Sequence, residues 1–454
     1  MTRLPRSAVG ICAALLLPAA AGAQQPRLTV SPDTALIDVP LQITASGLRP
    51  GQRVALSAVI REDSVDALLA TATFIADSQG RVDASTMAPL AGTYAGVSPA
   101  GLLWSGQRVK VADLSPPPAP STPFALSAPY DITFTLRADG ELLAQAQVTR
   151  RFVSPTVRVS EVRDSGLVGR LFLPGTARGT LPGVVVLSGS EGGYESSSFQ
   201  AGLLASHGFA ALALAYFRAP GLPDELALIP LEYLKRGIDW LGARPDVDGR
   251  RLAVWGGSRG AELALLLGAT FPVTVRVVVA YAPSIATGAG LTRDGRPRAE
   301  SAWTLGGRQF PIMEIRPPPE ALAQFSRPDP VRLRLLYEPG LSDSAALAHA
   351  SIPVERIAAA VILISGEDDQ MGPSDIAGDM IIRRLEAARH AAPRLHLKYP
   401  HAGHLISVPF LPTALRLRAW RFAVGGTSEG YAHADADSWP RVLRFLQENL
   451  TAAH

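Results

Sequence analysis

The last two thirds of the sequence alternate short apolar runs with helical segments. Residues 183–187 and 210–216 are apolar throughout, as strands buried on both faces are. Residues 231–241 follow the 3.6-residue period of an amphipathic helix, and strand-like and helical patterns alternate again across residues 360–399. Because strands that alternate with helices pair in parallel and are covered on both faces, residues 154–454 are predicted to form a doubly wound, mainly parallel α/β domain.

Residues 285–350 interrupt this alternation. They are rich in Pro and Arg and follow neither the helical nor the strand period. An irregular stretch of this length inside a compact domain is uncommon unless it serves a function. We therefore interpret residues 285–350 as a cap-like insertion, whose role the sequence leaves open.

Residues 24–153 favour strands instead. Residues 41–44 alternate in polarity, and Asp139-Gly140 separates two strand-like runs, residues 131–136 and 142–148. An Asp-Gly pair is typical of the two-residue turn of a β-hairpin. Short strands separated by turn signals predict an all-β, immunoglobulin-like sandwich in front of the α/β domain.

The composition excludes several classes of protein. The 454 residues are 47% hydrophobic and 18% charged, which is typical of a globular chain of more than one domain. The formal net charge is +3, but the basic residues are scattered singly, so no nucleic-acid partner is expected. The only cysteine is Cys12, so disulfides, thiolate metal sites and a cysteine nucleophile are excluded from the rest of the chain.

The first 23 residues resemble a secretory signal peptide. Arg3 and Arg6 precede an apolar run at residues 8–21, and Ala21-Gly22-Ala23 fits a cleavage site between small residues. The run is too short to span a membrane, although an uncleaved anchor is the alternative. We therefore expect an exported protein, periplasmic or secreted, with no stable membrane insertion once residues 1–23 are removed.

A nucleophile motif lies between a predicted strand and a predicted helix. Residues 256–260 read Gly-Gly-Ser-Arg-Gly, which fits G-x-S-x-G, between the apolar residues 252–255 and the helical residues 261–268. In this setting a tight strand-to-helix turn exposes the serine hydroxyl above the sheet, and side chains at the flanking glycines would collide with the turn. The motif predicts Ser258 as a nucleophile and the α/β-hydrolase fold for this domain; an ordinary structural turn is the alternative.

A serine hydroxyl needs a base, and the base needs an orienting acid, which this fold supplies downstream in the order Ser, Asp, His. The apolar residues 362–365 lead into an acidic turn in which Asp369 is the predicted acid and Asp368 the competitor. After the next strand, His404 follows a glycine and is predicted as the base in preference to His401. Without partner side chains at ligand spacing, the acidic turn predicts no metal site.

The tetrahedral intermediate of acyl transfer needs two backbone N–H donors. One is predicted to be the N–H of Arg259, directly after the nucleophile, and the other to come from the Gly-rich residues 188–193, with Ser190 preferred and Glu191 next. The competing reading of residues 188–193 as a phosphate cradle is disfavoured because the G-K-[ST] ending is missing and a carboxylate repels phosphate. No cofactor is predicted.

Several further segments occur in a characteristic order along the chain. They are residues 88–97 (Ala-Pro-Leu-Ala-Gly-Thr-Tyr-Ala-Gly-Val), 101–104, 164–169, 256–263, 352–355, 366–369, 403–404 and 432–434. With these segments the chain resembles the acyl-CoA thioesterases and bile acid-CoA:amino acid N-acyltransferases over nearly its whole length. The resemblance implies a β-sandwich fused to an α/β-hydrolase domain, with Ser258, Asp369 and His404 at the positions of the catalytic triad.

The resemblance also implies a substrate and a reaction. Acyltransferase members tend to carry cysteine as nucleophile, so Ser258 is more similar to the thioesterases, and Glu262 occupies a family position with a structural role. The expected reaction is hydrolysis of an acyl thioester or ester through an acyl-enzyme. The alternatives are an exported carboxylesterase acting on an ester without coenzyme A, N-acyl transfer to an amine, and a catalytically silent binding module.

Overall fold

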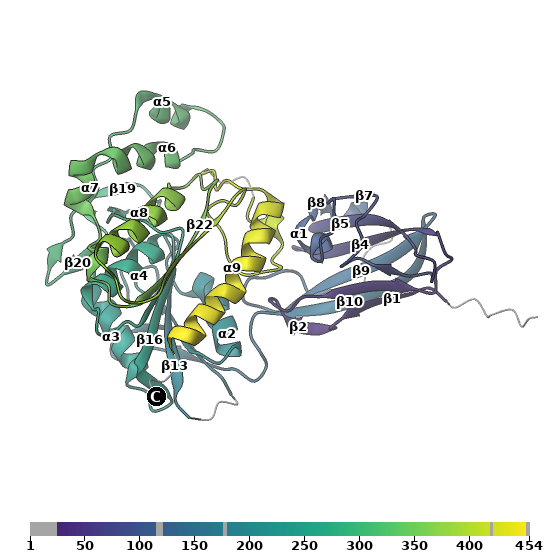
Figure 1. Ribbon diagram of the computed structural model, residues 1–454, viewed down its shortest axis with the longest axis horizontal. Coiled ribbons are helices and arrows are strands. Elements are labelled where there is room, and N and C mark those ends of the chain that lie inside the picture. The colour runs from purple at the N-terminus through teal and green to yellow at the C-terminus, as the bar shows by residue number, and fades with distance from the viewer. Residues whose placement is uncertain (1–24, 115–120, 176–178, 418–420, 451–454) are drawn as a thin grey trace, which may run out of the picture.

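The computed structural model describes residues 25–114, 121–175, 179–417 and 421–450, so the predicted signal segment, residues 1–23, lies outside the described residues. A strand-rich N-terminal part lies beside a larger C-terminal part, in which helices cover a central sheet (Figure 1). The C-terminal part begins with β11 (Arg158–Val162).

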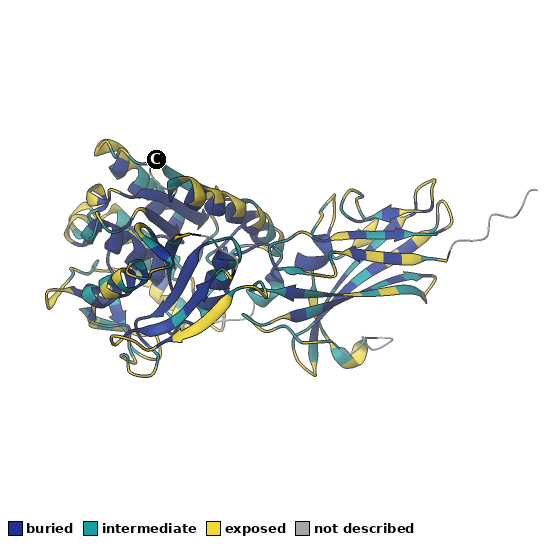
Figure 2. Ribbon diagram, turned by 90° about the horizontal axis from the view of Figure 1, so that it is seen from below, coloured by how far each residue is buried: buried dark blue, intermediate teal, exposed yellow. Residues whose placement is uncertain are grey.

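The central sheet has eight strands in the order β11-β12-β14-β13-β16-β17-β22-β23. The seven after β11 are β12 (Val168–Leu173), β14 (Ala210–Ala215), β13 (Leu181–Leu187), β16 (Val247–Gly257), β17 (Val277–Tyr281), β22 (Ala360–Gly366) and β23 (Arg394–Tyr399). β12 is antiparallel to both of its neighbours, and all pairs from β14 to β23 are parallel. This is the α/β-hydrolase architecture, as the serine motif predicted. The sequence did not reveal the edge strand β11, because four of its five residues are exposed (Figure 2).

Helices cover both faces of this sheet (Figure 1). α2 (Glu195–Ser206) and α9 (Ser428–Asn449) pack on one face, and α3 (Leu231–Gly242), α4 (Arg259–Thr270) and α8 (Ser374–Ala387) on the other. Alternate residues of β13 accordingly enter different cores, Val184 and Val186 the first and Val185 and Leu187 the second. Burial on both faces explains why the strands are apolar without alternation.

The N-terminal part consists of two sheets. One contains β1 (Arg27–Ser31), β3 (Gln42–Ser46) and β6 (Val82–Asp83); the other contains β2 (Thr34–Leu36), β10 (Glu141–Arg151), β9 (Tyr130–Ala138), β4 (Arg53–Arg61), β5 (Asp66–Ile75), β7 (Ala91–Gly92) and β8 (Gln107–Lys110). The predicted hairpin is confirmed: β9 and β10 pair antiparallel. Asp139 and Gly140 between them have φ values of 51° and 85°, the left-handed conformation that this turn requires. A short helix, α1 (Gly101–Trp104), follows β7.

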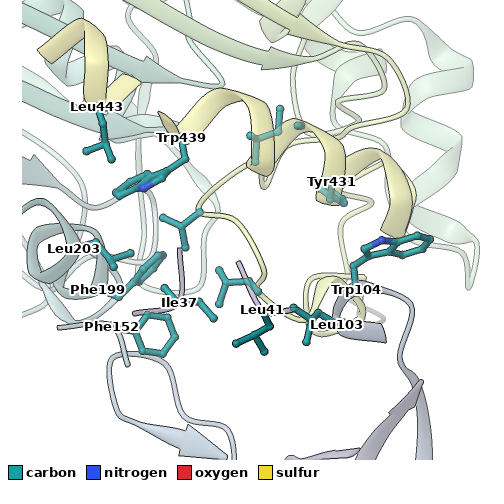
Figure 3. Close-up of a cluster of buried hydrophobic side chains, with 14 of the residues drawn as sticks. Ile37, Leu41, Leu103, Trp104, Phe152, Phe199, Leu203, Tyr431, Trp439 and Leu443 are labelled. Carbon is teal, nitrogen blue, oxygen red and sulfur yellow. The ribbon is translucent and has the colours of Figure 1, made fainter. Parts of the chain in front are cut away.

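The two parts share one apolar core, which runs from the N-terminal sheets to the helices α2 and α9 (Figure 3). Phe152 meets Phe199 of α2 edge to face, with ring centroids 5.7 Å apart. Polar contacts cross the same junction: the Asp38 carboxylate is 2.5 Å from His207 Nε2 and accepts a hydrogen bond from Trp439 Nε1 at 2.9 Å. The junction therefore combines buried apolar area with hydrogen bonds to Asp38 Oδ2 from both sides.

Residues 285–350 are more regular than the sequence suggested. They contain β18 (Ala289–Leu291), β19 (Pro297–Ser301), β20 (Trp303–Leu305), β21 (Arg308–Gln309), α5 (Pro319–Leu322), α6 (Arg334–Tyr337) and α7 (Ser344–Ala350). β20 pairs with β15 (Ile229–Pro230) just before α3. α5, α6 and α7 lie at the end of the molecule away from the N-terminal sheets (Figure 1). Among the described residues, no helix is long and apolar enough to cross a membrane.

Candidate active site

Ser258 occupies the sharp turn between β16 and α4. Its φ of 55° and ψ of −119° are strained for a residue with a side chain. A Cβ on Gly256 would lie 2.0 Å from the carbonyl oxygen of Gly260, and one on Gly260 would lie 2.5 Å from that of Ser188. Both flanking glycines are therefore required for the close approach of strand, turn and helix. The turn places Ser258 at the N-terminus of α4, where the helix dipole favours negative charge.

Asp369 lies in the turn after β22 and is completely buried. Its Oδ1 accepts hydrogen bonds from the backbone N–H groups of Met371 at 2.9 Å and Gly372 at 3.1 Å. Its Oδ2 accepts one from the Ser374 hydroxyl at 2.6 Å. The neighbouring Asp368 instead accepts hydrogen bonds from Gln370 and from the backbone of Gly426. The two carboxylates thus have different partners, and of the two only Asp369 contacts a histidine.

That histidine is His404, whose Nδ1 lies 2.9 Å from Asp369 Oδ2 and 3.0 Å from Oδ1. The loop that carries it is fixed by a hydrogen bond from the His404 backbone N–H to the carbonyl of Val424 at 2.9 Å. The other ring nitrogen, Nε2, is buried and has no hydrogen-bond partner within the described part of the chain. It is therefore free to take a proton from a neighbouring group. His401, the alternative base, has an exposed side chain.

The environment of His404 affects its pKa in two directions. Burial favours the neutral imidazole and so lowers the pKa. The charge of Asp369 and its hydrogen bond act in the opposite direction, with a further contribution from the charge of Glu191, and the net result is a raised pKa. The imidazolium that forms when His404 accepts a proton is thus stabilised in the folded protein.

Ser258 and His404 both line a cavity of about 300 Å³. Nine of the eighteen other lining residues are apolar or aromatic: Leu126, Val186, Leu187, Phe199, Trp255, Tyr281, Leu405, Ile406 and Leu411. Leu126 comes from the N-terminal part, and Leu405, Ile406 and Leu411 follow the histidine. Among the described residues, none from 285–350 lines this cavity. The cavity is suited to an apolar group attached to the carbon that Ser258 would attack.

The residues predicted as oxyanion donors, Arg259 and Ser190, are next to residues that line the cavity but do not line it themselves. Arg259 begins α4, and its backbone N–H has no acceptor within the ranges that the structure describes. Ser188, Gly189 and Glu191 line the cavity, whereas Ser190 does not. The backbone N–H of Gly189 donates to the Glu191 carboxylate at 3.1 Å. In the described structure the backbone N–H groups of Ser190 and Glu191 make no hydrogen bond, so both remain available as donors.

Two contributors to the site escaped the sequence analysis. Ser374, at the start of α8, donates to Asp369, and Leu126 reaches the cavity from the N-terminal part. Neither carries a sequence signal, because each contact depends on how separate segments meet in space. Within the described ranges, no group of three or more His, Cys, Asp or Glu side chains could hold a metal ion.

A second set of Ser, His and Asp side chains lies outside the cavity. The Ser365 hydroxyl is 2.7 Å from His396 Nε2, and His396 Nδ1 is 3.0 Å from Asp379 Oδ1. Ser365 is only 1% exposed and does not line the cavity. Burial lowers the pKa of His396 more than Asp379 raises it. We interpret this set as a link between β22, β23 and α8, because no substrate can reach the hydroxyl.

Comparisons with known proteins identify the family. Residues 229–452 match the model described as "BAAT / Acyl-CoA thioester hydrolase C terminal", and residues 38–164 match "Acyl-CoA thioester hydrolase/BAAT N-terminal region". The chain is 30% identical to mouse acyl-coenzyme A thioesterase 5, with 91% of this chain and 94% of the relative covered. It is 28% identical to mouse acyl-coenzyme A amino acid N-acyltransferase 1, with 93% and 98% covered.

The comparisons contradict the predicted export. The peroxisomal succinyl-coenzyme A thioesterase of mouse is 28% identical over 92% of this chain and 95% of its own length. Its name places that relative in an organelle, and the other relatives are likewise named as enzymes of acyl-coenzyme A. The prediction of a periplasmic or secreted protein is therefore wrong. It was based on the first 23 residues alone: two arginines, an apolar run and the small residues Ala21-Gly22-Ala23. This pattern is not by itself specific for export.

Fold, segment order and full-length similarity agree with one another. The α/β-hydrolase sheet follows a strand-rich N-terminal part, and the two family models match segments of both parts. The chain therefore belongs to the family of acyl-CoA thioester hydrolases and bile acid-CoA:amino acid N-acyltransferases, and it is an enzyme that hydrolyses thioesters.

Proposed function

We propose that this enzyme cleaves acyl-coenzyme A thioesters through an acyl-enzyme on Ser258, with His404 as general base and Asp369 as the acid that orients it. One observation carries the proposal: the cavity that contains Ser258 also contains a histidine whose far nitrogen bonds a buried carboxylate. Nucleophile, base and orienting acid are the three functions that acyl transfer to a serine requires.

In the first half-reaction His404 Nε2 takes the Ser258 proton while Oγ attacks the thioester carbonyl. The tetrahedral intermediate collapses with loss of the thiolate, which His404 protonates, and the acyl group stays on Ser258. In the second half-reaction His404 deprotonates a water molecule that attacks the acyl-serine. The charge of Asp369 stabilises the imidazolium in both steps, in agreement with the raised pKa of His404.

The oxyanion of each tetrahedral intermediate would accept hydrogen bonds from the backbone N–H of Arg259 and from the loop at residues 188–193. Of the two loop donors that remain free, we propose Glu191 in preference to Ser190, because Glu191 lines the cavity and Ser190 does not. Such donors act on charge that develops only in the transition state, so their loss lowers kcat by about 10²–10³-fold.

Transfer of the acyl group to an amine is the second candidate reaction, because relatives named as amino acid N-acyltransferases match nearly the whole chain. The two reactions share the acyl-enzyme and differ in what attacks it. Serine at position 258 favours hydrolysis, since transferase members of the family tend to carry cysteine there.

We propose further that residues 24–153 fold as an immunoglobulin-like sandwich and residues 154–454 as the catalytic domain. The inner residues of both N-terminal sheets, such as Ile43 of β3 and Leu56 of β4, belong to the same core, as sandwich packing requires.

An activity panel tests the function directly. Purified protein would be offered acyl-CoA esters of increasing chain length, with release of the free thiol as the readout, and with and without glycine or taurine. Hydrolysis by wild type and its loss in Ser258→Ala are expected, with free acid as the product. A faster reaction with glycine and an amide product would favour the transferase. Equal activity of Ser258→Ala and wild type would overturn the proposal.

A further inference from the structure

The carboxylate of Glu262 is buried one turn into α4 and only 2% of the residue is exposed. It accepts three hydrogen bonds. Trp303 Nε1 donates to Oε1 at 2.6 Å, the backbone N–H of Gly288 donates to Oε1 at 3.0 Å, and Arg259 Nη1 donates to Oε2 at 2.6 Å. Two of the three donors thus belong to the insertion, and the third belongs to the residue next to Ser258.

The insertion also holds the Arg259 side chain directly. Arg259 Nη2 donates to the carbonyl of Ala289 at 2.6 Å, and its guanidinium carbon lies 5.9 Å from the centre of the Trp303 ring. Gly288 packs so closely that a Cβ on it would lie 2.1 Å from Arg259 Nη1. The guanidinium is therefore enclosed by Glu262, Trp303 and residues 288–289.

This cluster lies behind the site and outside the cavity. Arg259, Glu262, Gly288 and Trp303 are all absent from the cavity lining. A buried carboxylate is stabilised when its oxygens are paired, so each of the three donors helps to hold Glu262 in place. The cluster can affect the site by positioning the backbone of Arg259, which directly follows the strained Ser258.

We propose that Glu262 is a positioning residue, which anchors residues 288–303 to the first turn of α4 and thereby keeps the Arg259 N–H aimed at the oxyanion. The insertion acts as a brace behind the nucleophile rather than as a cover over the cavity. This inference rests on the proposed function, since it assigns the Arg259 N–H to the tetrahedral intermediate. A shift of about 1 Å in such a donor is enough to cost about 10²-fold in rate.

The chain offers a matched control. Glu232, at the start of α3, accepts a hydrogen bond from the backbone N–H of Gly306 at 2.6 Å. It therefore also joins the insertion to a helix, but to one that does not carry the nucleophile. Glu232→Gln removes the charge from this hydrogen bond without touching Arg259. Glu262→Gln removes the charge that holds Arg259 and keeps the size of the side chain.

The experiment measures kcat, KM, the pH profile and Tm for wild type, Glu262→Gln, Glu262→Ala, Trp303→Phe and Glu232→Gln with one acyl-CoA. We expect kcat to fall about tenfold in Glu262→Gln, which would disturb the oxyanion donor in part. In Glu262→Ala, where the donor is disturbed more, we expect a fall of about 100-fold. KM should change less than twofold, and the pH profile should keep its position because His404 is untouched. Glu232→Gln should keep the wild-type kcat. For Trp303→Phe we expect a kcat between those of wild type and Glu262→Gln. If Glu262→Ala does not fold, Glu262→Gln and Trp303→Phe together test the inference.

Two results would overturn the inference while the proposed function stands. One is a wild-type kcat in Glu262→Gln together with a lowered Tm, which would reduce Glu262 to a folding role. The other is an equal loss of kcat in Glu232→Gln, which would show that any loosening of the insertion slows the reaction. Wild-type protein that neither hydrolyses acyl-CoA nor reacts with a fluorophosphonate would overturn both the proposed function and this inference. Activity that is present in wild type and lost in Ser258→Ala would support the proposed function, whatever the Glu262 variants show.

Discussion

His404 Nδ1 lies 2.9 Å from Asp369 Oδ2, although the two residues are 35 positions apart and belong to loops after different strands. Asp369 has no exposed surface, and four hydrogen bonds reach its oxygens from the histidine, two backbone N–H groups and one hydroxyl. A carboxylate with this many donors is held in one orientation. It therefore fixes both the ring orientation and the tautomer of the histidine, and within the described residues Nε2 is left without a hydrogen-bond partner.

The first prediction concerns pH. His404 must be neutral to accept a proton, and its pKa is raised, so kcat/KM should fall with decreasing pH at a value above the ordinary histidine pKa of about 6.5. Asp369→Asn removes the charge that raises the pKa of His404, while the burial that lowers this pKa remains. The acid limb should therefore move to lower pH. The wrong tautomer should also reduce kcat by roughly 10⁴-fold. A pH profile of kcat/KM measures the shift, and an unmoved acid limb in the variant would contradict the assignment.

The second prediction tests the charge of Glu191. This carboxylate raises the pKa of His404 and lines the cavity. Glu191→Gln should move the acid limb of the kcat/KM profile to lower pH by a smaller amount than Asp369→Asn does. Glu195→Gln is the control, because its charge does not contribute to the His404 pKa. Equal shifts in both variants would point to a general surface charge effect.

The third prediction concerns the glycines around the nucleophile. Gly256→Ala places its methyl against the carbonyl of Gly260, which is backbone and cannot move aside, so loss of nearly all activity is expected. The nearest atom to a Cβ on Gly257 is 4.0 Å away, an ordinary contact. Gly257→Ala should therefore fold with a Tm within a few degrees of wild type. Circular dichroism melting and active-site titration distinguish the two variants.

The fourth prediction separates the two Ser, His and Asp sets. A fluorophosphonate should label Ser258 only, since Ser365 is buried away from the cavity. Labelling should persist in Ser365→Ala and disappear in Ser258→Ala, as peptide mass spectrometry of the modified serine can show. Modification of Ser365 in folded protein would mean that the second set is accessible after all.

The fifth prediction concerns the junction between the two parts. Trp439→Phe removes one of the two hydrogen-bond partners of Asp38 Oδ2 in a buried setting, so the free energy of unfolding should fall by about 1–3 kcal/mol in addition to the lost ring contacts. Trp240→Phe removes a similar bond to Asp164 at the surface and should cost about 0.5 kcal/mol. Urea unfolding of both variants measures the difference. Equal losses would show that the Asp38 contact is not specifically stabilising.

The sequence predicted most of the sheet because strands buried on both faces are apolar without interruption, as in β13 and β14. Helices were harder to delimit. The sequence predicts the last helix only at residues 440–449, because proline is typical of the first position of a helix, whereas α9 begins at Ser428. The sequence predicts a helix only at residues 201–207, whereas α2 begins at Glu195, because serines are poor helix formers and obscure its first turn. In the structure the hydroxyls of Ser197 and Ser198 donate to the carbonyl of Tyr194.

Within the site, the motif and the order of the residues were enough to predict Ser258, Asp369 and His404 as the candidates. The choice of Asp369 over Asp368 depends on which carboxylate faces the histidine, and the sequence does not show in which direction each side chain points. The loop at residues 188–193 shows the same limit. Glu191 folds back onto the Gly189 N–H, so the availability of each donor depends on turn geometry. The wall contributed by Leu126 required the arrangement of two parts of the chain.

That wall has a consequence for engineering. Since Leu126 belongs to the strand-rich part, an isolated catalytic half would open the acyl cavity on one side and expose apolar surface to water. Exchange of the N-terminal half between relatives should therefore alter which acyl chains are preferred, even with every catalytic residue unchanged. We therefore expect the preferred acyl chain to depend in part on how the N-terminal and C-terminal parts of the polypeptide pack together.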